Sequence, residues 1–160
     1  MHSVYLLTGS NLGNRETQLL LCNEALNNKA GTIVQVSGIY ETEAWGIEGL
    51  PAHLNQAIHL STPLEPLQLL DVIQEIENEL GRIRDQKWGV RAIDIDIIYF
   101  DQIILDLPQL IIPHPYLQQR NFVLAPLTEI APDFVHPLLK KTNRQLFEIS
   151  EDRLAVRLVR

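Results

Sequence analysis

The chain has 160 residues and a net charge of −7, and 46% of its residues are hydrophobic. This length predicts a single domain over residues 1–160, with enough apolar side chains for a core. The acidic balance argues against a general nucleic-acid or anionic-membrane binder, because both need a basic surface. The sequence lacks a secretory leader pattern and an apolar run of the ~20 residues that span a membrane, so we expect a cytoplasmic protein. We also expect a monomer.

The first part of the chain alternates between apolar runs and turn residues. The run over residues 4–8 ends at Gly9-Ser10-Asn11, which is typical of a strand followed by a turn. Asn14 is placed to cap a helix that continues to about Asn28. Branched and apolar residues predict two further strands, over residues 33–40 and 53–60. The loop 41–52 between these strands is long for a small domain, and such loops are often functional.

The second part contains the clearest helix and the most informative strand. Apolar residues at helical spacing predict a helix over residues 67–80, which Gly81 would end. We expect the later elements to be a strand over 93–100, a strand over 103–105 that forms a hairpin with it, helices over 124–130 and 143–149, and a last strand over 154–159.

The predicted order is roughly β-α-β-β-α-β. This is the split βαβ pattern of ferredoxin-like α+β domains, in which helices pack on one face of a mainly antiparallel sheet.

Two aspartates lie on the predicted strand 93–100. Successive strand residues point to opposite faces, so Asp94 and Asp96 share one face, about 7 Å apart, while the neighbouring isoleucines face the core. Two like charges side by side repel, and partial burial increases the repulsion. Mg²⁺ would relieve it, because this ion prefers one or two carboxylates together with waters and phosphate oxygens. A solvated strand face without a metal is the alternative that the spacing alone leaves open.

A basic loop leads into this strand. Arg82, Arg84, Lys87 and Arg91 lie close together in an otherwise acidic chain. Arginine and lysine match phosphate oxygens, so loop and aspartates together favour a metal-bound polyphosphate over a salt-bridged surface loop. The glycine-rich phosphate-binding motifs are missing, so side chains and metal would have to hold the phosphates.

Two other classes of protein share parts of this pattern. A glycosyltransferase with an Asp-x-Asp motif also binds a nucleotide diphosphate through a metal, although the chain looks too short for one. A non-enzymatic ferredoxin-like module would need neither the paired aspartates nor the arginines. Mg²⁺-dependent ATP binding would separate the second class from a site for a metal-bound polyphosphate.

Motifs along residues 3–135 resemble those of one family. The most specific is the segment from Trp88-Gly89-Val90-Arg91 to Asp94-Ile95-Asp96-Ile97. The others are Gly9-Ser10-Asn11-Leu12-Gly13, Tyr40-Glu41-Thr42-Glu43, Leu54-Asn55, Gly81-Arg82-Ile83-Arg84, Pro113-His114-Pro115 and Arg120-Asn121-Phe122-Val123-Leu124-Ala125-Pro126-Leu127. Together they resemble the 6-hydroxymethyl-7,8-dihydropterin pyrophosphokinase family of folate biosynthesis.

The resemblance implies an activity and a set of site residues. It implies a ferredoxin-like fold and transfer of pyrophosphate from Mg·ATP to the hydroxymethyl group of 6-hydroxymethyl-7,8-dihydropterin, with AMP as the second product. It implies two Mg²⁺ ions held by Asp94 and Asp96, and catalytic roles for Arg82, Arg91, Asp94 and Asp96. The positions implied for the pterin are Thr42, Glu43, Ala44, Trp45, His53, Asn55 and Phe122. The positions implied for ATP are Gln74, Glu77, Arg84, Lys87, Trp88, Ile97, His114 and Arg120.

The chain departs from the family pattern at a few of these positions. His53 stands where Tyr or Phe is common, and Lys87 stands where Arg is usual. Asp85 occupies a frequently basic position, and Ala44-Trp45 replaces a pair that usually contains proline.

Overall fold

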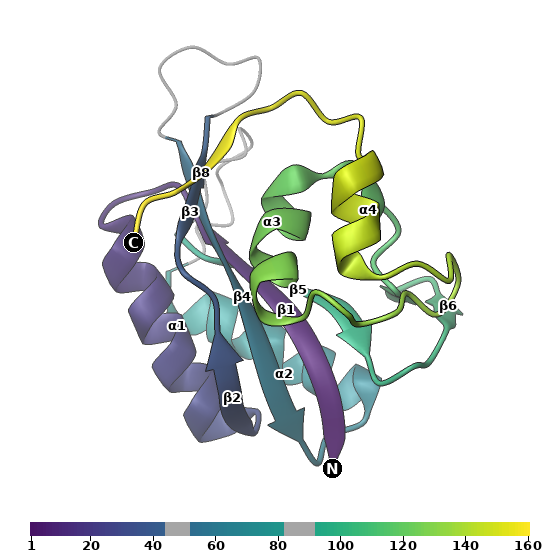
Figure 1. Cartoon of the computed structure of the whole chain (residues 1–160). Helices are drawn as coiled ribbons and strands as arrows, with labels where there is room; N and C mark the ends of the chain where they lie inside the picture. The colour runs from purple at the N-terminus through teal and green to yellow at the C-terminus, as the bar shows by residue number, and fades with distance from the viewer. Residues whose placement is uncertain (44–51, 82–91) are drawn as a thin grey trace.

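A computed structural model describes residues 1–43, 52–81 and 92–160, and Figure 1 shows how their helices and strands are arranged. The first elements are β1 (His2–Ser10), α1 (Arg15–Lys29), β2 (Thr32–Val36), β3 (Tyr40–Thr42), β4 (His53–Thr62) and α2 (Pro66–Glu79). The later elements are β5 (Asp94–Phe100), β6 (Leu105–Leu107), β7 (Leu110–Ile112), the 3-10 helix η1 (Leu117–Gln119), α3 (Asn121–Ile130), α4 (Asn143–Ile149) and β8 (Val156–Leu158).

The main sheet has the strand order β5-β1-β4-β3-β8, and β2 also pairs with β4. Every strand pair within the described residues is antiparallel. The order β5-β1-β4-β2, with α1 and α2 as the connections, is the ferredoxin-like α+β arrangement that the sequence predicted.

Helices cover both faces of this sheet, so the expectation of a single covered face was wrong (Figure 1). On one face, Leu19 and Leu26 of α1 and Ile73 of α2 pack in a core with strand residues. On the other face, Leu124 of α3 and Leu146 of α4 belong to a second core. The two predicted connecting helices, α1 and α2, form the first layer. The later helices were also predicted, but no sequence pattern indicated which face of the sheet α3 and α4 would cover.

The predicted strand 33–40 is divided into β2 and β3. The backbone N–H of Gly38 donates to the Glu129 carboxylate, at 3.2 and 3.1 Å from its two oxygens. The Ser37 hydroxyl accepts a hydrogen bond from the N–H of Ala57 at 2.9 Å. These hydrogen bonds to side chains take the place of some backbone hydrogen bonds between the strands. β2 and β3 each still pair with β4.

The hairpin expected between residues 93–100 and 103–105 is also wrong. Residues 105–107 instead form β6 and pair with β7. The two residues between these strands are Pro108 and Gln109, and proline presets the backbone for a tight turn. This nearby partner explains why the segment does not add to β5.

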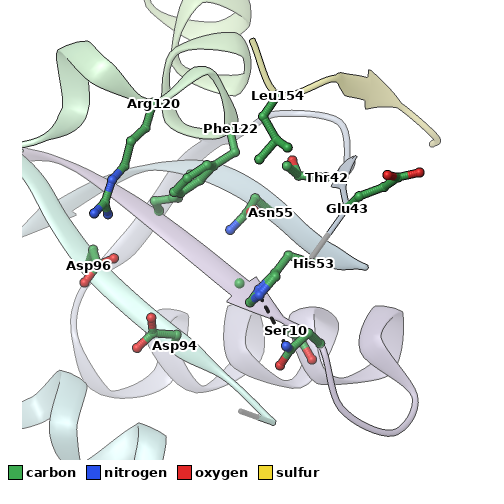
Figure 2. Close-up of a pocket in the computed structure, with 13 residues that line it drawn as sticks. Ser10, Thr42, Glu43, His53, Asn55, Asp94, Asp96, Arg120, Phe122 and Leu154 are labelled. Atoms are coloured by element: carbon green, nitrogen blue, oxygen red, sulfur yellow. Dashed lines mark hydrogen bonds between the residues drawn. The ribbon is translucent and has the colours of Figure 1, made fainter. Parts of the chain in front are cut away.

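The side-chain alternation predicted for β5 is confirmed at its start. Ile95 and Ile97 are buried in the core beneath α1 and α2. Asp94 and Asp96 are half-buried on the opposite face, and Figure 2 shows both carboxylates on the same side of the strand. Further along, the consecutive residues Ile98 and Tyr99 are both buried in the second core, because the β1–β5 ladder has a register shift at this point.

The helix ends follow the predicted local signals. The Asn14 side chain accepts a hydrogen bond from the N–H of Thr17 at 3.1 Å and caps α1. Gly81 follows α2 with a φ of 90°, a left-handed conformation that glycine adopts without strain. No helix in the described ranges is long and apolar enough to cross a membrane.

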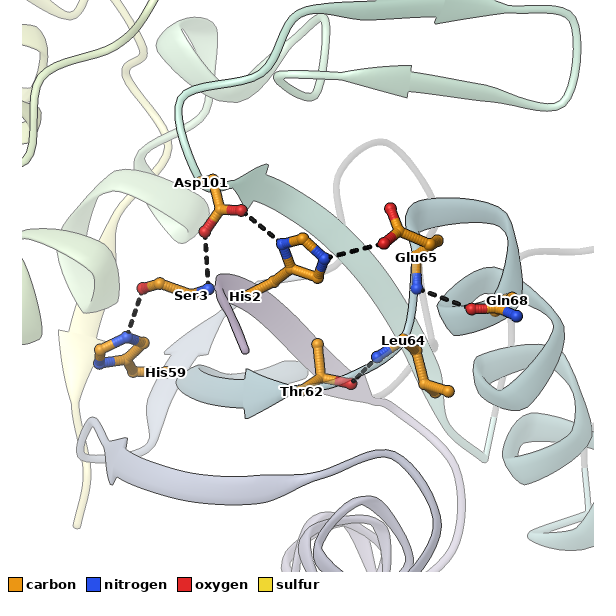
Figure 3. A network of polar contacts seen from close by, with 8 residues as sticks. All are labelled: His2, Ser3, His59, Thr62, Leu64, Glu65, Gln68 and Asp101. Carbon is orange, nitrogen blue, oxygen red and sulfur yellow. Dashed lines mark hydrogen bonds and ion pairs between the residues drawn. The ribbon is translucent and has the colours of Figure 1, made fainter.

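A polar network ties the start of β1 to its neighbours (Figure 3). The His2 ring lies between two carboxylates, with Nδ1 2.7 Å from Asp101 Oδ2 and Nε2 3.1 Å from Glu65 Oε1. Asp101 also accepts the backbone N–H of Ser3 at 2.7 Å. The hydrogen bonds to Asp101 and Glu65 raise the pKa of His2 above 6.5, because only the protonated ring can donate to both.

This network predicts a pH-dependent contribution to stability. A raised pKa means that the contribution of His2 is complete below pH 6.5 and is lost as the pH rises through the pKa of the folded state. The stability difference between the wild type and His2→Gln should therefore shrink between about pH 6 and pH 8.5. Urea unfolding at a series of pH values measures it.

His59→Gln provides a control, because its effect on stability should change with pH in the opposite direction. Burial lowers the pKa of His59, so the contribution of this residue should grow as the pH rises through that lowered pKa and should be complete above about pH 7. A His2→Gln difference that stays constant with pH would contradict the assignment.

Candidate active site

The strand register brings polar side chains together at the end of β1. Gly9 lies opposite Asp94 of β5 on one side and opposite Asn55 of β4 on the other. A Cβ at position 9 would lie 2.6 Å from Asn55 Nδ2, so only glycine leaves the Asn55 amide room to cross β1. Leu7, two residues earlier, lies opposite Asp96.

A cavity of about 350 Å³ opens on this face of the sheet (Figure 2). The two aspartates lie on one side of it, and Thr42, His53 and Asn55 lie on another side. The cavity is completed by Arg120 and Phe122 near the start of α3, and by Leu154 from the segment before β8. We call this space the first cavity.

Several buried polar groups face the first cavity. Thr42 is 3% exposed and Ser10 is 1% exposed, and neither hydroxyl has a hydrogen-bond partner among the described residues. Asn55 is 6% exposed and uses its Nδ2 to donate to the Thr8 carbonyl at 3.2 Å. Buried polar groups without partners cost stability, so their presence indicates a polar ligand that completes their hydrogen bonds.

His53 is neutral in this arrangement. The Asn11 side-chain amide lies 3.2 Å from His53 Nε2, and it donates to that nitrogen when the nitrogen carries no proton. Burial lowers the pKa of His53, although the charge of Asp94 acts in the opposite direction. The ring therefore presents a flat, uncharged surface to the first cavity at neutral pH.

The Arg120 guanidinium is held between two aromatic rings. Its carbon lies 5.1 Å from the centre of the Tyr116 ring and 5.6 Å from the centre of the Phe122 ring. Such cation–π contacts orient the planar guanidinium without neutralising it. Arg120 therefore provides a positive charge on the same cavity as the two aspartates.

A second cavity of about 300 Å³ lies beside the first and shares Asp96 with it. Leu70 of α2, Ile97 of β5 and Leu110 of β7 give it apolar surfaces, and His114 adds a polar group. Burial and the charge of Arg120 lower the pKa of His114, so its ring is also uncharged near neutral pH. The second cavity has the size and the mixed lining of a site for a flat heterocycle.

Two residues predicted for ATP lie away from both cavities. Gln74 is exposed on α2. Glu77 is 4% exposed, and its carboxylate accepts the backbone N–H of Ile95 at 2.9 Å. Because Ile95 lies between Asp94 and Asp96, Glu77 fixes the backbone of the strand that carries both aspartates.

The other predicted site residues fall into two groups. Six of them, Thr42, Glu43, His53, Asn55, Arg120 and Phe122, line the first cavity with the two aspartates, and Ile97 and His114 line the second. The predictions for Ala44, Trp45, Arg82, Arg84, Lys87, Trp88 and Arg91 lie outside the described residues.

The sequence did not single out every residue that lines the cavities. Ser10 and Asn11 were noted only as part of a motif, although a polar pair at a strand end is a signal for a site. Leu70 was assigned to the apolar face of a helix. Nothing in the sequence pointed to Leu154, because its neighbours in the first cavity are distant along the chain.

The aspartates fit a magnesium ion better than a metal held entirely by the protein. Within the described residues no three His, Cys, Asp or Glu side chains gather into a metal-binding group. Zinc sites usually need three or four protein ligands, whereas Mg²⁺ takes one or two carboxylates and fills its remaining positions with water and phosphate oxygens. Asp94 and Asp96, on an open cavity, have the chemistry that this ion prefers.

The fold and the two adjoining cavities are typical of a small α+β domain that brings two ligands together. Comparison with known families identifies the domain further. A model of the 7,8-dihydro-6-hydroxymethylpterin-pyrophosphokinase (HPPK) family matches residues 5–132, and the chain belongs to this family. The resemblance of the sequence motifs is thereby confirmed.

Individual relatives agree with this assignment. The chain is 46% identical over 127 residues to 2-amino-4-hydroxy-6-hydroxymethyldihydropteridine pyrophosphokinase of Bacillus subtilis, covering 79% of this chain and 76% of the relative. It is 40% identical over 145 residues to the protein of the same name from Aquifex aeolicus, covering 91% and 90% of the two chains.

Solved structures support the fold. A crystal structure of Plasmodium falciparum HPPK-DHPS with pteroate superposes with a TM-score of 0.76 at 19% sequence identity. The match covers 92% of this chain but only 42% of that longer chain. Membership of the family decides against both a glycosyltransferase and a non-enzymatic module.

The contact between Glu77 and β5 predicts a stability effect. Glu77→Ala leaves the Ile95 N–H without its carboxylate, so the free energy of unfolding should fall by about 1–3 kcal/mol. Glu77→Gln retains an oxygen acceptor and should lose less. Urea unfolding measures both, with Glu75→Ala, an exposed carboxylate on the same helix, as the control. Equal losses for Glu77→Ala and Glu75→Ala would contradict the role of Glu77.

Proposed function

We propose that the first cavity binds 6-hydroxymethyl-7,8-dihydropterin, that the second binds the nucleoside of ATP, and that the chain transfers pyrophosphate from ATP to the pterin hydroxymethyl group. The activity follows from the family to which the chain belongs, in which the product enters folate biosynthesis. What the geometry adds is an assignment of the two substrates to two neighbouring cavities.

One observation carries this assignment. Asp96 lines both cavities, so a group held at its carboxylate is adjacent to both substrates. Transfer between two bound molecules requires the reacting atoms to approach within about 3–3.5 Å. A residue shared by both cavities lies where that approach has to occur.

The first cavity suits a pterin because of its unsatisfied polar groups. A pterin is a flat ring with donors and acceptors along its edge. The buried Thr42 hydroxyl and the Asn55 amide can complete hydrogen bonds with that edge. Phe122 can stack on one ring face, as aromatic side chains do in sites for flat heterocycles. His53 provides a second flat surface, and Glu43 lies at the border of the cavity.

The second cavity suits the adenosine part of ATP. Leu70 and Ile97 offer apolar surfaces for the base, and His114 lines the same cavity as Asp96 and offers a polar group to the nucleotide. Arg120 faces the first cavity, where the transferred phosphates would meet the acceptor. Its guanidinium matches phosphate oxygens and would stabilise the charge that develops on them.

Asp94 and Asp96 would hold two Mg²⁺ ions. Bound there with ATP, the ions would neutralise phosphate charge and lower the pKa of the acceptor hydroxyl. The aspartates contribute by keeping two carboxylates on one face of a rigid strand, whose backbone Glu77 fixes. Gln74 stays in the proposal as a residue near the nucleotide.

The reaction balances without a covalent protein intermediate. The pterin hydroxymethyl oxygen forms a bond to the β-phosphorus of ATP. The bond from that phosphorus to the oxygen bridging the α-phosphorus breaks, and AMP leaves with the bridging oxygen. The hydroxyl proton passes to water. The protein orients both molecules and stabilises charge, as in other phosphoryl transfers.

The remaining predicted residues enter the proposal on the family resemblance alone. Arg82 and Arg91 would stabilise the transferred group. Ala44 and Trp45 would contact the pterin, and Arg84, Lys87 and Trp88 would contact ATP. The expectation of a monomer stays a prediction.

Removal of one aspartate tests the catalytic assignment. Asp96→Ala should lower turnover at least about 100-fold, because it removes a metal-holding group, while the protein stays folded. A coupled assay of AMP formation, run with and without Mg²⁺ and with and without the pterin, measures the loss. Asp106→Ala is the control, since Asp106 is exposed on β6 and lines neither cavity. Turnover near that of the wild type in Asp96→Ala would overturn the assignment.

The polar groups of the first cavity give a second test. Thr42→Val removes a hydroxyl that has no partner in the described structure, so the free energy of unfolding should not fall. The affinity of the Thr42→Val variant for the pterin should fall by about five- to tenfold, because the ligand loses a hydrogen bond. Asn55→Ala should likewise weaken pterin binding more than ATP binding. Calorimetry with each ligand separately measures these changes, and equal losses for the two ligands would reject the proposed pterin site.

A further inference from the structure

Leu154 is an unexpected member of the first cavity. It lies in the segment between α4 and β8, and Figure 2 shows its side chain directed towards Phe122 and Thr42. The side chain is half-buried, so one part packs on the protein and another part faces the cavity. Phe122 and Leu154 together give the cavity an apolar side opposite the aspartates.

The chain after Leu154 is fixed to the sheet. β8 pairs with β3, and Val156 lies directly opposite Thr42. The next residue, Arg157, forms an ion pair with Glu41 at 2.7 Å. The position of Leu154 is therefore coupled to the strand that carries Thr42.

The chain before Leu154 is fixed by Asp152. The carboxylate of Asp152 accepts the backbone N–H of Asn121 at 2.9 Å and the backbone N–H of Leu154 at 3.0 Å. The Asn121 side chain donates in return to the Asp152 carbonyl at 3.3 Å. One carboxylate thus joins Leu154 to the start of α3.

This contact replaces a missing helix cap. Arg120 occupies the N-cap position of α3 and makes no capping hydrogen bond with its side chain. A carboxylate at a helix N-terminus satisfies a free N–H group and interacts favourably with the helix dipole. An arginine side chain has no acceptor and cannot cap a helix N-terminus, so Asp152 supplies the cap while Arg120 and Phe122 line the first cavity.

We propose that residues 152–154 form a fixed wall of the acceptor site, in which Leu154 packs against the bound pterin and determines its affinity, and Asp152 is the positioning residue that holds Leu154 and the start of α3 in place. This inference rests on the proposed function, because it assumes that the first cavity is the pterin site. It adds a specificity-determining contact from a segment beyond the part that matches the family model, which ends at residue 132.

Truncation of Leu154 is the first experiment. Leu154→Ala should lower pterin affinity about tenfold, because apolar contact with the ligand is lost, and should leave ATP affinity unchanged. Leu154→Phe should also lower pterin affinity, because its larger ring occupies ligand volume, and it provides a second variant if the first folds poorly. Leu158→Ala is the control, since Leu158 is an exposed leucine of the same segment and lines neither cavity. Calorimetry with the pterin and with ATP measures each affinity.

A double-mutant cycle tests the positioning role of Asp152. Asp152→Asn should raise the KM for the pterin in the wild-type background, with a smaller change in kcat. In the Leu154→Ala background the same substitution should raise the KM for the pterin by a clearly smaller factor, because Asp152 acts in part through Leu154. Glu151→Gln, a neighbouring exposed carboxylate, should change neither constant.

The outcomes separate this inference from the proposed function. A wild-type protein that binds no pterin overturns the proposed function, and this inference falls with it. A wild-type protein that binds the pterin, with unchanged affinity in folded Leu154→Ala or Leu154→Phe, overturns only the role of Leu154. If the effects of Asp152→Asn and Leu154→Ala on the KM for the pterin are fully additive, only the role of Asp152 is overturned.

Discussion

The repulsion between two carboxylates on one face of β5 is the constraint on which the rest of the site depends. Asp94 and Asp96 lie on the same face of the strand, separated by the buried Ile95. The fold holds them there in spite of their charge, with Glu77 fixing the backbone between them. Thr42, His53 and Asn55 across the cavity carry no charge to offset them, and Arg120 is the described cation that lines the same cavity. Such an arrangement is stable when divalent cations bind between the carboxylates and an anionic ligand.

The central position of β1 explains why this constraint can be met. β1 lies between β5 and β4, so its end touches the aspartate strand on one side and the Asn55 strand on the other. Gly9 has no side chain to separate them. Acidic and amide groups from two strands therefore face one space without any contact between their own strands.

Local patterns were sufficient to predict much of this structure. The helix spacing in α2, the cap at Asn14 and the alternation in β5 are encoded by neighbouring residues, and all three were predicted correctly. The motifs of the family located Thr42, Asn55 and the aspartates before any geometry was known. Other features depend on partners that are distant along the chain. The break at Gly38 depends on Glu129, and the start of α3 depends on Asp152, which is 31 residues further along the chain than Asn121. The residues near Gly38 or Asn121 in the sequence do not indicate these distant hydrogen-bond acceptors. They also do not indicate that Leu154 lines the same cavity as Gly9.

The late position of Asp152 and Leu154 in the chain has a consequence for synthesis on the ribosome. Every other residue named for the two cavities is translated before them, and β3 has no β8 to pair with until residues 156–158 have emerged. A nascent chain can therefore form the central strands and the aspartate pair while its acceptor cavity still lacks one side. Under the proposed function, the site for the pterin is completed only when this segment has been translated, after the sheet and its two aspartates are already in place.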